Sequence, residues 1–488
     1  MRNRVRSHSA LVVTLVLVSI PSIGTAQVTQ IIDKFGDGAG NRLNDPLGLA
    51  LDGSGNIYVS GVLSDNVFRI TPGGTITELV DWTGDGLGNM LVGPTDIAVD
   101  GSGNVYVACL VSDNAFKITP AGVITELIDA TGDGLGNTLH NCVGISVDGS
   151  GNVYVSGRLS DNAFKITPGG VITELIDGTG DGLGNTLDGP GEIALDGSGN
   201  VYVACIFSDN VFRITPGGVI TEIIDATGDG AGNPLSSARG LAVDGSGTVY
   251  VSADGSSNVF EVSDPAGANT ITEIIDSTGD GMGNPLYFAT GVVADAAGEV
   301  HVAGWGSDNV FRITPGGVIT EIIDATGDGA GHLLDDSYKV AQDPAGSIYV
   351  TGSFSDNAFR ICFGSFTPYG SACSGSVGGS PPELSGSGCL AVGQDATLQV
   401  TGGTANGLGG LFFGASQTAI PAPWGCTVLV TPGSFALLFM LDGTGSVSVA
   451  GSVPPSASGQ RAFVQAFLQD SSVAGGFATT SGLEIEFP

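Results

Sequence analysis

The stretch Ser112-Asp113-Asn114-Ala115-Phe116-Lys117-Ile118 decides the fold, because the chain repeats it at regular intervals. Further copies of the motif Ser-Asp-Asn-(Val/Ala)-Phe-(Arg/Lys)-Ile begin at Ser64, Ser160, Ser208, Ser307 and Ser355, and a diverged copy begins at Ser256. Successive copies are 48 residues apart, except for one step of 51. A fixed period of this length, made of short alternating segments, is typical of one blade of a β-propeller.

Each repeat contains four strand-like segments, which in the copy from Asp96 are residues 97–100, 105–108, 115–118 and 123–128. Glycine-rich and proline-containing turns separate them, as in antiparallel hairpins. Seven copies of the first three segments are present, but the fourth is missing after Ile361. Residues 28–33 match that missing segment. We therefore expect an all-β, seven-bladed propeller over residues 27–362, in which the N-terminal strand completes the last blade and covers two sheet edges.

The N-terminus has the features of a secretory signal peptide over residues 1–26: three arginines, an apolar stretch from Leu11 to Ile20, and small residues before Gln27. This predicts a secreted or cell-surface protein. No later apolar run reaches the roughly 20 residues of a membrane helix, so we expect no transmembrane segment. The formal net charge of −34 repels phosphate groups, which argues against nucleic acid or anionic membranes as partners.

The composition changes after Cys362. Residues 363–382 are rich in Gly, Ser and Pro and are predicted to be a linker, and residues 383–488 are predicted to form a small β-sandwich. Four of the seven cysteines surround this region and allow three disulfide pairings, of which we favour Cys389–Cys426 and Cys362–Cys373. The other three lie in the repeats. Either they are small buried core residues or Cys142 bonds one of the others, Cys109 and Cys205.

The loops between blades carry the motif Asp-x-Thr-Gly-Asp-Gly-x-Gly-Asn, which resembles the start of an EF-hand calcium loop. Its paired aspartates are candidate Ca²⁺ ligands: Asp81, Asp85, Asp129, Asp133, Asp177, Asp181, Asp225, Asp229, Asp276, Asp280, Asp324 and Asp328. However, the bidentate Glu expected at position 12 is absent from every copy. The alternative is that these side chains cap tight turns by bonding their own backbone. Propeller topology places these loops and the Ser-Asp-Asn loops on one face, which holds cations or is simply a solvated acidic surface.

The repeats resemble NHL repeats in the segment from Gly191 to Val203 and again from Asn210 to Ile214. The run Ile-Thr-Pro-Gly-Gly-Val-Ile-Thr-Glu resembles the streptogramin lyase-like propellers. The resemblance implies the propeller fold, but such propellers include binding modules, lactonase-like metal enzymes and lyases. The lyases' paired catalytic His and Glu are not apparent, since His140, His301 and His332 are scattered over three blades. The C-terminal part resembles β-sandwich modules of large secreted bacterial proteins, which suggests surface display.

Comparing the seven repeats with one another indicates a candidate site. At the start of the inner strand four copies have Gly, whereas the others carry a charge that should face the central channel. At nearby equivalent positions of the repeats, most copies carry uncharged residues, whereas single copies carry a charged or an aromatic residue. The resulting ligand-binding candidates are Asp96, Glu192, Lys339, Arg239, Arg158 and Trp305. Convergent charges at a channel mouth are a typical pocket, and ordinary repeat drift with paired charges is the alternative.

The leading functional hypothesis is a secreted, monomeric, non-catalytic binding or surface-interaction protein, stabilised by calcium if the loops bind it. It would take a protein, glycan or small-molecule ligand at the propeller face. The alternative is an enzyme of the streptogramin lyase or gluconolactonase type, which would use Asp96, Glu192, Arg239 and Lys339 on a small molecule or polysaccharide at the central channel.

Overall fold

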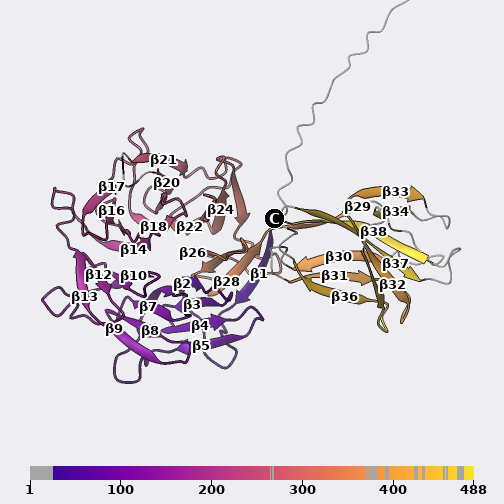
Figure 1. Cartoon of the computed structure of the whole chain (residues 1–488), viewed down its shortest axis with the longest axis horizontal. Coiled ribbons are helices and arrows are strands. Elements are labelled where there is room, and N and C mark those ends of the chain that lie inside the picture. Colours follow the sequence, from indigo (N-terminus) through magenta and orange to yellow (C-terminus); the bar gives the residue numbers. More distant parts are fainter. Residues whose placement is uncertain are drawn as a thin grey trace, which may run out of the picture.

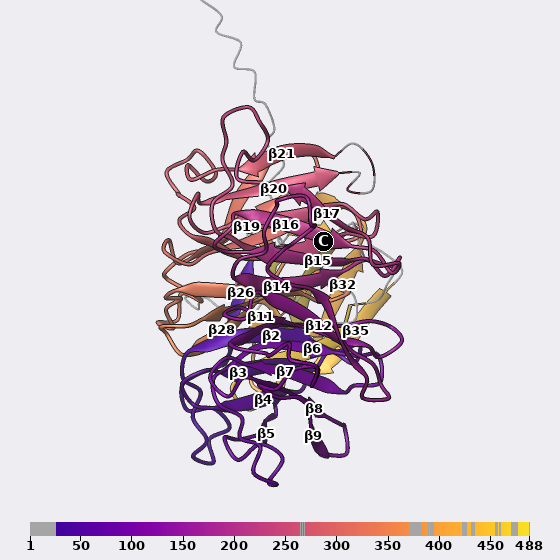
Figure 2. The same cartoon turned by 90° about the vertical axis from the view of Figure 1, so that its left-hand side faces the viewer.

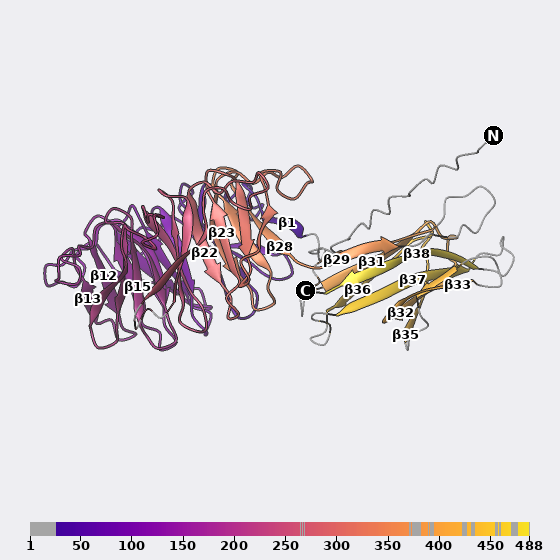
Figure 3. The same ribbon diagram turned by 90° about the horizontal axis from the view of Figure 1, so that it is seen from above.

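The computed structural model describes residues 26–263, 265, 267, 269–369, 372, 382–388, 390, 395–421, 427–430, 435–453, 457, 460–469 and 477–487. Within these residues the fold is all-β, as the repeats predict, with a seven-bladed propeller and a β-sandwich side by side (Figures 1 and 3). The predicted signal peptide, apart from Ala26, lies outside the described residues, as do Cys373, Cys389 and Cys426. None of the described segments is a helix long and apolar enough to span a bilayer.

The first three blades are four-stranded antiparallel sheets that run in sequence order from the channel outward. Blade 1 comprises β2 (Pro46–Leu51), β3 (Ile57–Gly61), β4 (Asn66–Ile70) and β5 (Ile76–Val80). Blade 2 comprises β6 (Pro94–Val99), β7 (Val105–Cys109), β8 (Asn114–Ile118) and β9 (Ile124–Ile128). Blade 3 comprises β10 (Cys142–Val147), β11 (Val153–Gly157), β12 (Asn162–Ile166) and β13 (Ile172–Ile176).

Blades 4 to 6 repeat this plan, and Figure 2 shows several of their strands. Blade 4 comprises β14 (Pro190–Leu195), β15 (Val201–Cys205), β16 (Asn210–Ile214) and β17 (Ile220–Ile224). Blade 5 comprises β18 (Ala238–Val243), β19 (Val249–Ala253), β20 (Asn258–Ser263) and β21 (Thr270–Ile275). Blade 6 comprises β22 (Ala289–Ala294), β23 (Val300–Gly304), β24 (Asn309–Ile313) and β25 (Ile319–Ile323).

Blade 7 closes the ring with strands from both ends of the propeller. Its inner strands are β26 (Ser337–Gln342), β27 (Ile348–Gly352) and β28 (Asn357–Cys362), and its outer strand is β1 (Gln27–Ile32). β1 pairs antiparallel with β28, with Val28 opposite Ile361 and Gln30 opposite Phe359. Figure 1 shows the indigo N-terminal strand beside the orange β28. The predicted closure by the N-terminal strand is confirmed.

The hydrophobic core lies between neighbouring blades. The second strand of each blade is buried along its whole length, because both of its faces meet a neighbouring sheet. Between blades 2 and 3, for example, Tyr106 and Ala115 pack with Val155 and Phe164, and all four are at most 1% exposed. Burying a side chain such as Phe164 stabilises the fold by roughly 1.5–3 kcal/mol.

The Ser-Asp-Asn motif links each blade to the next. Asp161 Oδ1 accepts the backbone N–H of Gly189 in the following blade at 2.9 Å, and Asp356 closes the ring by accepting that of Asp45 at 2.9 Å. The same bond occurs at every blade boundary, with a serine hydroxyl in place of the carboxylate at Ser257. These motif aspartates, expected to form a ring of solvated or cation-binding groups, are therefore hydrogen-bonded clasps between blades.

The C-terminal sandwich packs a five-stranded sheet, order β29-β38-β37-β32-β35, on a three-stranded sheet, order β30-β31-β36. Leu398 and Val400 of the smaller sheet share one core with Leu411 and Val464 of the larger. The strands are β29 (Ser365–Tyr369), β30 (Glu383–Gly388), β31 (Asp395–Thr401), β32 (Leu408–Gly414), β33 (Gln417–Pro421), β34 (Thr427–Val430), β35 (Phe435–Met440), β36 (Val447–Ser452), β37 (Arg461–Gln469) and β38 (Phe477–Glu486).

Strand β29 falls within the stretch that composition assigned to a linker. It pairs along its whole length with β38, and the Tyr369 hydroxyl donates to the Leu429 carbonyl at 2.9 Å. A composition window rich in Gly, Ser and Pro does not register Phe366, Thr367 and Tyr369, which are residue types common in strands. The linker prediction for residues 363–382 is therefore wrong at Ser365–Tyr369. The chain enters the sandwich through Phe363, whose ring lies 5.3 Å from the Arg312 guanidinium of blade 6.

Candidate functional site

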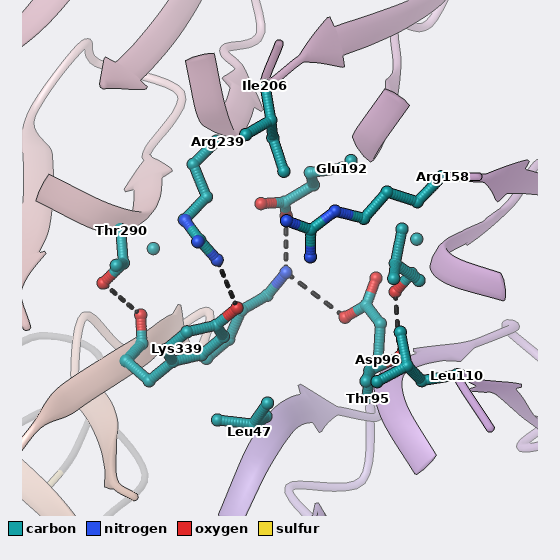
Figure 4. A pocket seen from close by; sticks show the side chains of 15 residues that line it. Leu47, Thr95, Asp96, Leu110, Arg158, Glu192, Ile206, Arg239, Thr290 and Lys339 are labelled. Atoms are coloured by element: carbon teal, nitrogen blue, oxygen red, sulfur yellow. Dashed lines mark hydrogen bonds and ion pairs between the residues drawn. The ribbon is translucent and has the colours of Figure 1, made fainter. Parts of the chain in front are cut away.

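The candidate site is a cavity of about 130 Å³ at one end of the propeller channel, which we call the channel mouth (Figure 4). It is formed by the first residues of the inner strands and by the loops between the second and third strands. The lining residues are Leu47, Thr95, Asp96, Leu110, Val143, Gly144, Arg158, Gly191, Glu192, Ile206, Arg239, Thr290, Gly291, Tyr338 and Lys339. Five of the six predicted ligand-binding residues line this cavity.

A lysine from blade 7 crosses the channel and ends between two carboxylates. Lys339 Nζ lies 2.5 Å from Glu192 Oε1 of blade 4 and 3.2 Å from Asp96 Oδ1 of blade 2. All three side chains are at most 18% exposed. Burial opposes the charge on Lys339, but the two carboxylates outweigh it and raise its pKa. We call Asp96, Glu192 and Lys339 the channel triad.

Each carboxylate of the channel triad has a second role, because it also accepts a backbone N–H from the next blade. Asp96 Oδ2 accepts that of Ile145 at 3.1 Å, and Glu192 Oε2 accepts that of Leu241 at 3.4 Å. Burial and the nearby Asp96 raise the pKa of Glu192, while Lys339 opposes them. The triad therefore joins blades 2, 4 and 7 and closes the channel below the mouth; a second cavity on its far side is lined by the same three residues.

A substitution on the neighbouring strand makes room for the charged side chains. Where the inner strand has Gly48, the hydroxyl of Ser60 accepts its N–H at 2.9 Å and lies 2.6 Å from where a Cβ would be. Blades 3 and 5 have the same glycine and serine pair. Opposite Asp96 and Glu192 the serine is replaced by alanine, at Ala108 and Ala204. The correspondence does not extend to the other two blades, because Ala303 accompanies Gly291 and Thr351 accompanies Lys339, whose N–H the Thr351 hydroxyl accepts at 3.1 Å.

Arg239 of blade 5 is held by two contacts beside the triad. Its Nε donates to Asp254 Oδ2 at 2.6 Å, and its Nη1 donates to the Tyr338 hydroxyl oxygen of blade 7 at 3.0 Å. Burial lowers the pKa of Arg239, but Tyr338 and Asp254 outweigh this effect and raise it. Figure 4 shows Arg239 at the side of the mouth, with a dashed line marking one of its interactions.

Arg158 reaches the mouth from the loop between β11 and β12. Its guanidinium carbon lies 5.3 Å from the centre of the Phe207 ring, an arrangement that favours a cation–π contact. Among the described residues its guanidinium makes neither an ion pair nor a side-chain hydrogen bond. Burial and the nearby charge of Arg239 lower the pKa of Arg158. Two guanidinium groups therefore line the mouth, and among the described residues Arg239 has a carboxylate partner whereas Arg158 has none.

The sixth predicted residue, Trp305, does not line the cavity. It occupies the same repeat position as Arg158, but its ring packs on Phe288, with the ring centres 5.7 Å apart. Sequence comparison missed Thr95, Thr290 and Tyr338, which line the mouth in the column that contains Arg239. A search of that column for every side chain with a polar group would have found them.

The predicted calcium loops are closed by their own hydrogen bonds. Asp129 Oδ1 accepts the N–H and the hydroxyl of Thr131, and Asp133 accepts the N–H of Leu135 and the side-chain amide of Asn137 at 2.8 Å. The turn-capping interpretation matches this geometry, and calcium binding stays a prediction. In the described part of the chain, one cluster of three acidic residues brings its carboxylate oxygens within 4.8 Å of one another. It consists of Asp308, Asp335 and Asp336, and none of these is a predicted calcium ligand.

Two other groups singled out from the sequence are buried in the core. Cys109, Cys142 and Cys205 are free cysteines and fully buried. Burial raises the pKa of the Cys142 thiol to about 12. His301 replaces the tyrosine of the other six repeats, and its ring nitrogens have no hydrogen-bond partner. Burial and the nearby charge of Arg312 lower the pKa of His301 to about 3. Neither group reaches the channel mouth.

Comparison with solved structures places the propeller among known folds. A streptogramin B lyase structure superposes with a TM-score of 0.55 at 15% identity, covering 69% of this chain and 98% of the other. The fold is that of this lyase. A virginiamycin B lyase from Staphylococcus aureus gives a TM-score of 0.53 at 17% identity, covering 69% and 99%. An extracellular domain from B. thetaiotaomicron gives 0.50 at 12% identity, covering 94% of this chain and 59% of the other.

A comparison with protein-family models finds no match, and neither does a comparison with curated proteins. At identities below 20%, the likeness to the solved structures concerns the fold and not the chemistry. The site must therefore be judged by its own residues.

Proposed function

We propose that this protein is a secreted, non-catalytic binding protein whose propeller holds a small ligand at the channel mouth. The observation that carries the proposal is the state of the carboxylates there: Asp96 and Glu192 both contact Lys339 and both accept a backbone N–H. A general base needs a free lone pair within reach of the substrate. Carboxylates engaged in this way support binding rather than proton transfer.

The composition of the mouth also supports binding. Apolar side chains such as Leu110 and Ile206 lie beside the guanidinium groups of Arg158 and Arg239. A concave, mostly apolar surface with a few convergent polar groups is the usual form of a ligand site. At two of the three triad positions, Asp96 and Glu192, the residue on the neighbouring strand is alanine and not serine, which leaves room for the carboxylate side chains.

Secretion is part of the proposal. It rests on the signal-like N-terminus and agrees with the extracellular origin of one structural neighbour. In this view the sandwich attaches the propeller to a larger surface assembly, while the channel mouth remains open to solvent.

The test separates binding from turnover. The purified mature protein is incubated with quinupristin, which is present in a solved virginiamycin B lyase structure, and with a gluconolactone, and products are measured by chromatography. We expect no product above the buffer control. A panel of organic acids, alcohols and sugars is then examined for a rise in melting temperature, which should occur for at least one class and be lost in Ile206→Trp, where the larger ring fills the mouth.

Turnover that disappears in Lys339→Met would overturn the proposal in favour of a lyase or lactonase. Absence of any stabilising compound in the panel would overturn the binding role itself.

A further inference from the structure

The guanidinium of Arg158 lies in the mouth without a counter-ion in the described part of the chain. Of the 12 Lys and Arg residues in the described part of the chain, four form ion pairs, so what distinguishes Arg158 is its place in the cavity and not the lack of a carboxylate partner. The residue is not fully exposed, because Arg158 is of intermediate burial and lines the cavity. A partly buried guanidinium costs free energy unless an anion or hydrogen-bond acceptor accompanies it. Arg158 therefore has unused capacity to bind an anion.

Arg239 completes a two-sided site. Its Nε and Nη1 are engaged by Asp254 and Tyr338, which fix the plane of the guanidinium at the side of the cavity. Arg158 and Arg239 line the same small cavity, and Figure 4 shows both side chains extending into it from different blades. Two guanidinium groups held close together suit a planar carboxylate, which accepts parallel hydrogen bonds from such forks.

The size of the mouth limits what can enter. A volume of about 130 Å³ is well below the roughly 300–1,000 Å³ of sites that enclose a whole drug-sized ligand. The mouth therefore accommodates the head of a ligand while the rest lies outside. Outside it, directly following lining residues in sequence, stand the exposed side chains of Val111, Leu159 and Phe207. Leu63 and Phe354 occupy the same repeat position, and exposure over these five ranges from 52% to 77%.

We propose that the ligand is an amphipathic monocarboxylate whose carboxylate binds between Arg158 and Arg239 and whose apolar body lies on the rim of Val111, Leu159 and Phe207. This inference rests on the proposed function and specifies the chemistry of its ligand. A monoanion fits better than a phosphate or sulfate dianion, because the protein's overall charge of −34 and the carboxylates of the channel triad repel additional negative charge.

The test uses octanoate as the probe, with octanamide as its neutral match and acetate as the same head without an apolar body. Binding to the mature protein is measured by calorimetry at low salt. We expect octanoate to bind, and octanamide and acetate to bind at least about 10-fold more weakly. Arg158→Gln should weaken octanoate binding about 10- to 100-fold, the usual range for hydrogen bonds to a charged group, and should leave octanamide unchanged.

Two control variants accompany Arg158→Gln. Arg42→Gln makes the same change in net charge at an exposed site outside the mouth, and it should leave octanoate binding as in the wild type. Arg158→Lys keeps the charge but removes the planar fork, so its affinity should fall between those of wild type and Arg158→Gln. Melting curves of all variants establish that each is folded.

The outcomes distinguish this inference from the function on which it rests. Equal binding of octanoate and octanamide, with both lost in Ile206→Trp, would refute carboxylate recognition and leave a ligand-binding mouth. Loss of octanoate binding in Arg42→Gln to the same extent as in Arg158→Gln would refute a specific site. No binding of octanoate to the wild type would overturn this inference, whereas the proposed function would be decided by its own panel of compounds.

Discussion

Replacing Lys339 with methionine should destabilise the propeller strongly, because Lys339 is the cation that the two triad carboxylates share. In the wild type its Nζ lies 2.5 Å from Glu192 and 3.2 Å from Asp96, and all three side chains are largely buried. The variant would leave two carboxylates facing one another in the channel. Removing one partner of a buried ion pair costs about 3–5 kcal/mol. In a domain of this size that corresponds to a fall in melting temperature of roughly 5–10 °C.

The pH dependence of the deficit identifies its cause. Burial already raises the pKa of Glu192, and loss of Lys339 removes the group that opposes this effect. When the pKa of a carboxyl group is higher in the folded than in the unfolded state, the protein loses stability as the pH rises from the unfolded-state pKa to the folded-state pKa. The deficit of Lys339→Met should therefore be largest at pH 8 and shrink toward pH 5. Thermal unfolding followed by circular dichroism at several pH values measures it.

The matched control restores the repeat consensus at the triad without leaving a charge unpaired. It combines Lys339→Gly with Asp96→Gly and Glu192→Gly, and it adds Ala108→Ser and Ala204→Ser to provide the hydroxyls that the glycine blades use. We expect this variant to be more stable than Lys339→Met despite its greater number of changes. A deficit in Lys339→Met that is independent of pH, or a control that is the less stable of the two, would refute the electrostatic argument.

Four further predictions concern the scaffold. Asp161→Ala should cost about 1–2 kcal/mol in urea unfolding by leaving a backbone N–H without its acceptor, whereas Asp161→Ser should cost less, because serine makes the same clasp in another blade. Buried His301 stays neutral in the folded state down to about pH 3, whereas in the unfolded state it takes up a proton below about pH 6.5. The free energy of unfolding should therefore fall by about 1.4 kcal/mol for each pH unit between pH 6.5 and pH 3, and His301→Tyr should remove this loss. If the loops bind calcium, millimolar Ca²⁺ should raise the melting temperature relative to chelator, and Asp133→Asn should reduce the gain; identical curves would favour turn capping. Deleting residues 28–33 should lower the melting temperature far more than deleting residues 374–380, and equal effects would contradict closure by β1.

The fold could be predicted from the sequence because the chain contains seven copies of the same structural repeat. Each repeat carries the same turns and the same alternation, so an ambiguity in one copy is resolved by another. The closing strand was predictable for the same reason, since Val28–Asp33 matches a segment missing elsewhere. Nothing comparable exists in the C-terminal part, where each strand occurs once. There the composition concealed β29, whose pairing with β38 joins segments far apart in the sequence.

The residues of the site were predictable only in part. The columns of the repeat identify which blade carries an unusual residue and on which face, and this was sufficient for Arg158, Arg239 and the channel triad. A column does not specify the direction of a side chain, which is why Trp305 was assigned to the mouth although it packs on Phe288. Contacts between side chains of distant blades could not be predicted from the sequence either. Tyr338 bonds Arg239 from a strand 99 residues away, and no local pattern relates them.

The distinction between symmetric and asymmetric features explains where function is to be sought in this molecule. The aspartates of the Ser-Asp-Asn motif occur in nearly every blade and form the same inter-blade bond each time, as a structural role requires. Lys339 occurs once and depends on Asp96 and Glu192, which also break the repeat. Seven identical blades would surround a channel with no chemical preference, because each side would offer the same groups. Selective binding therefore requires the departures from the repeat, and those that meet in space do so at the channel mouth.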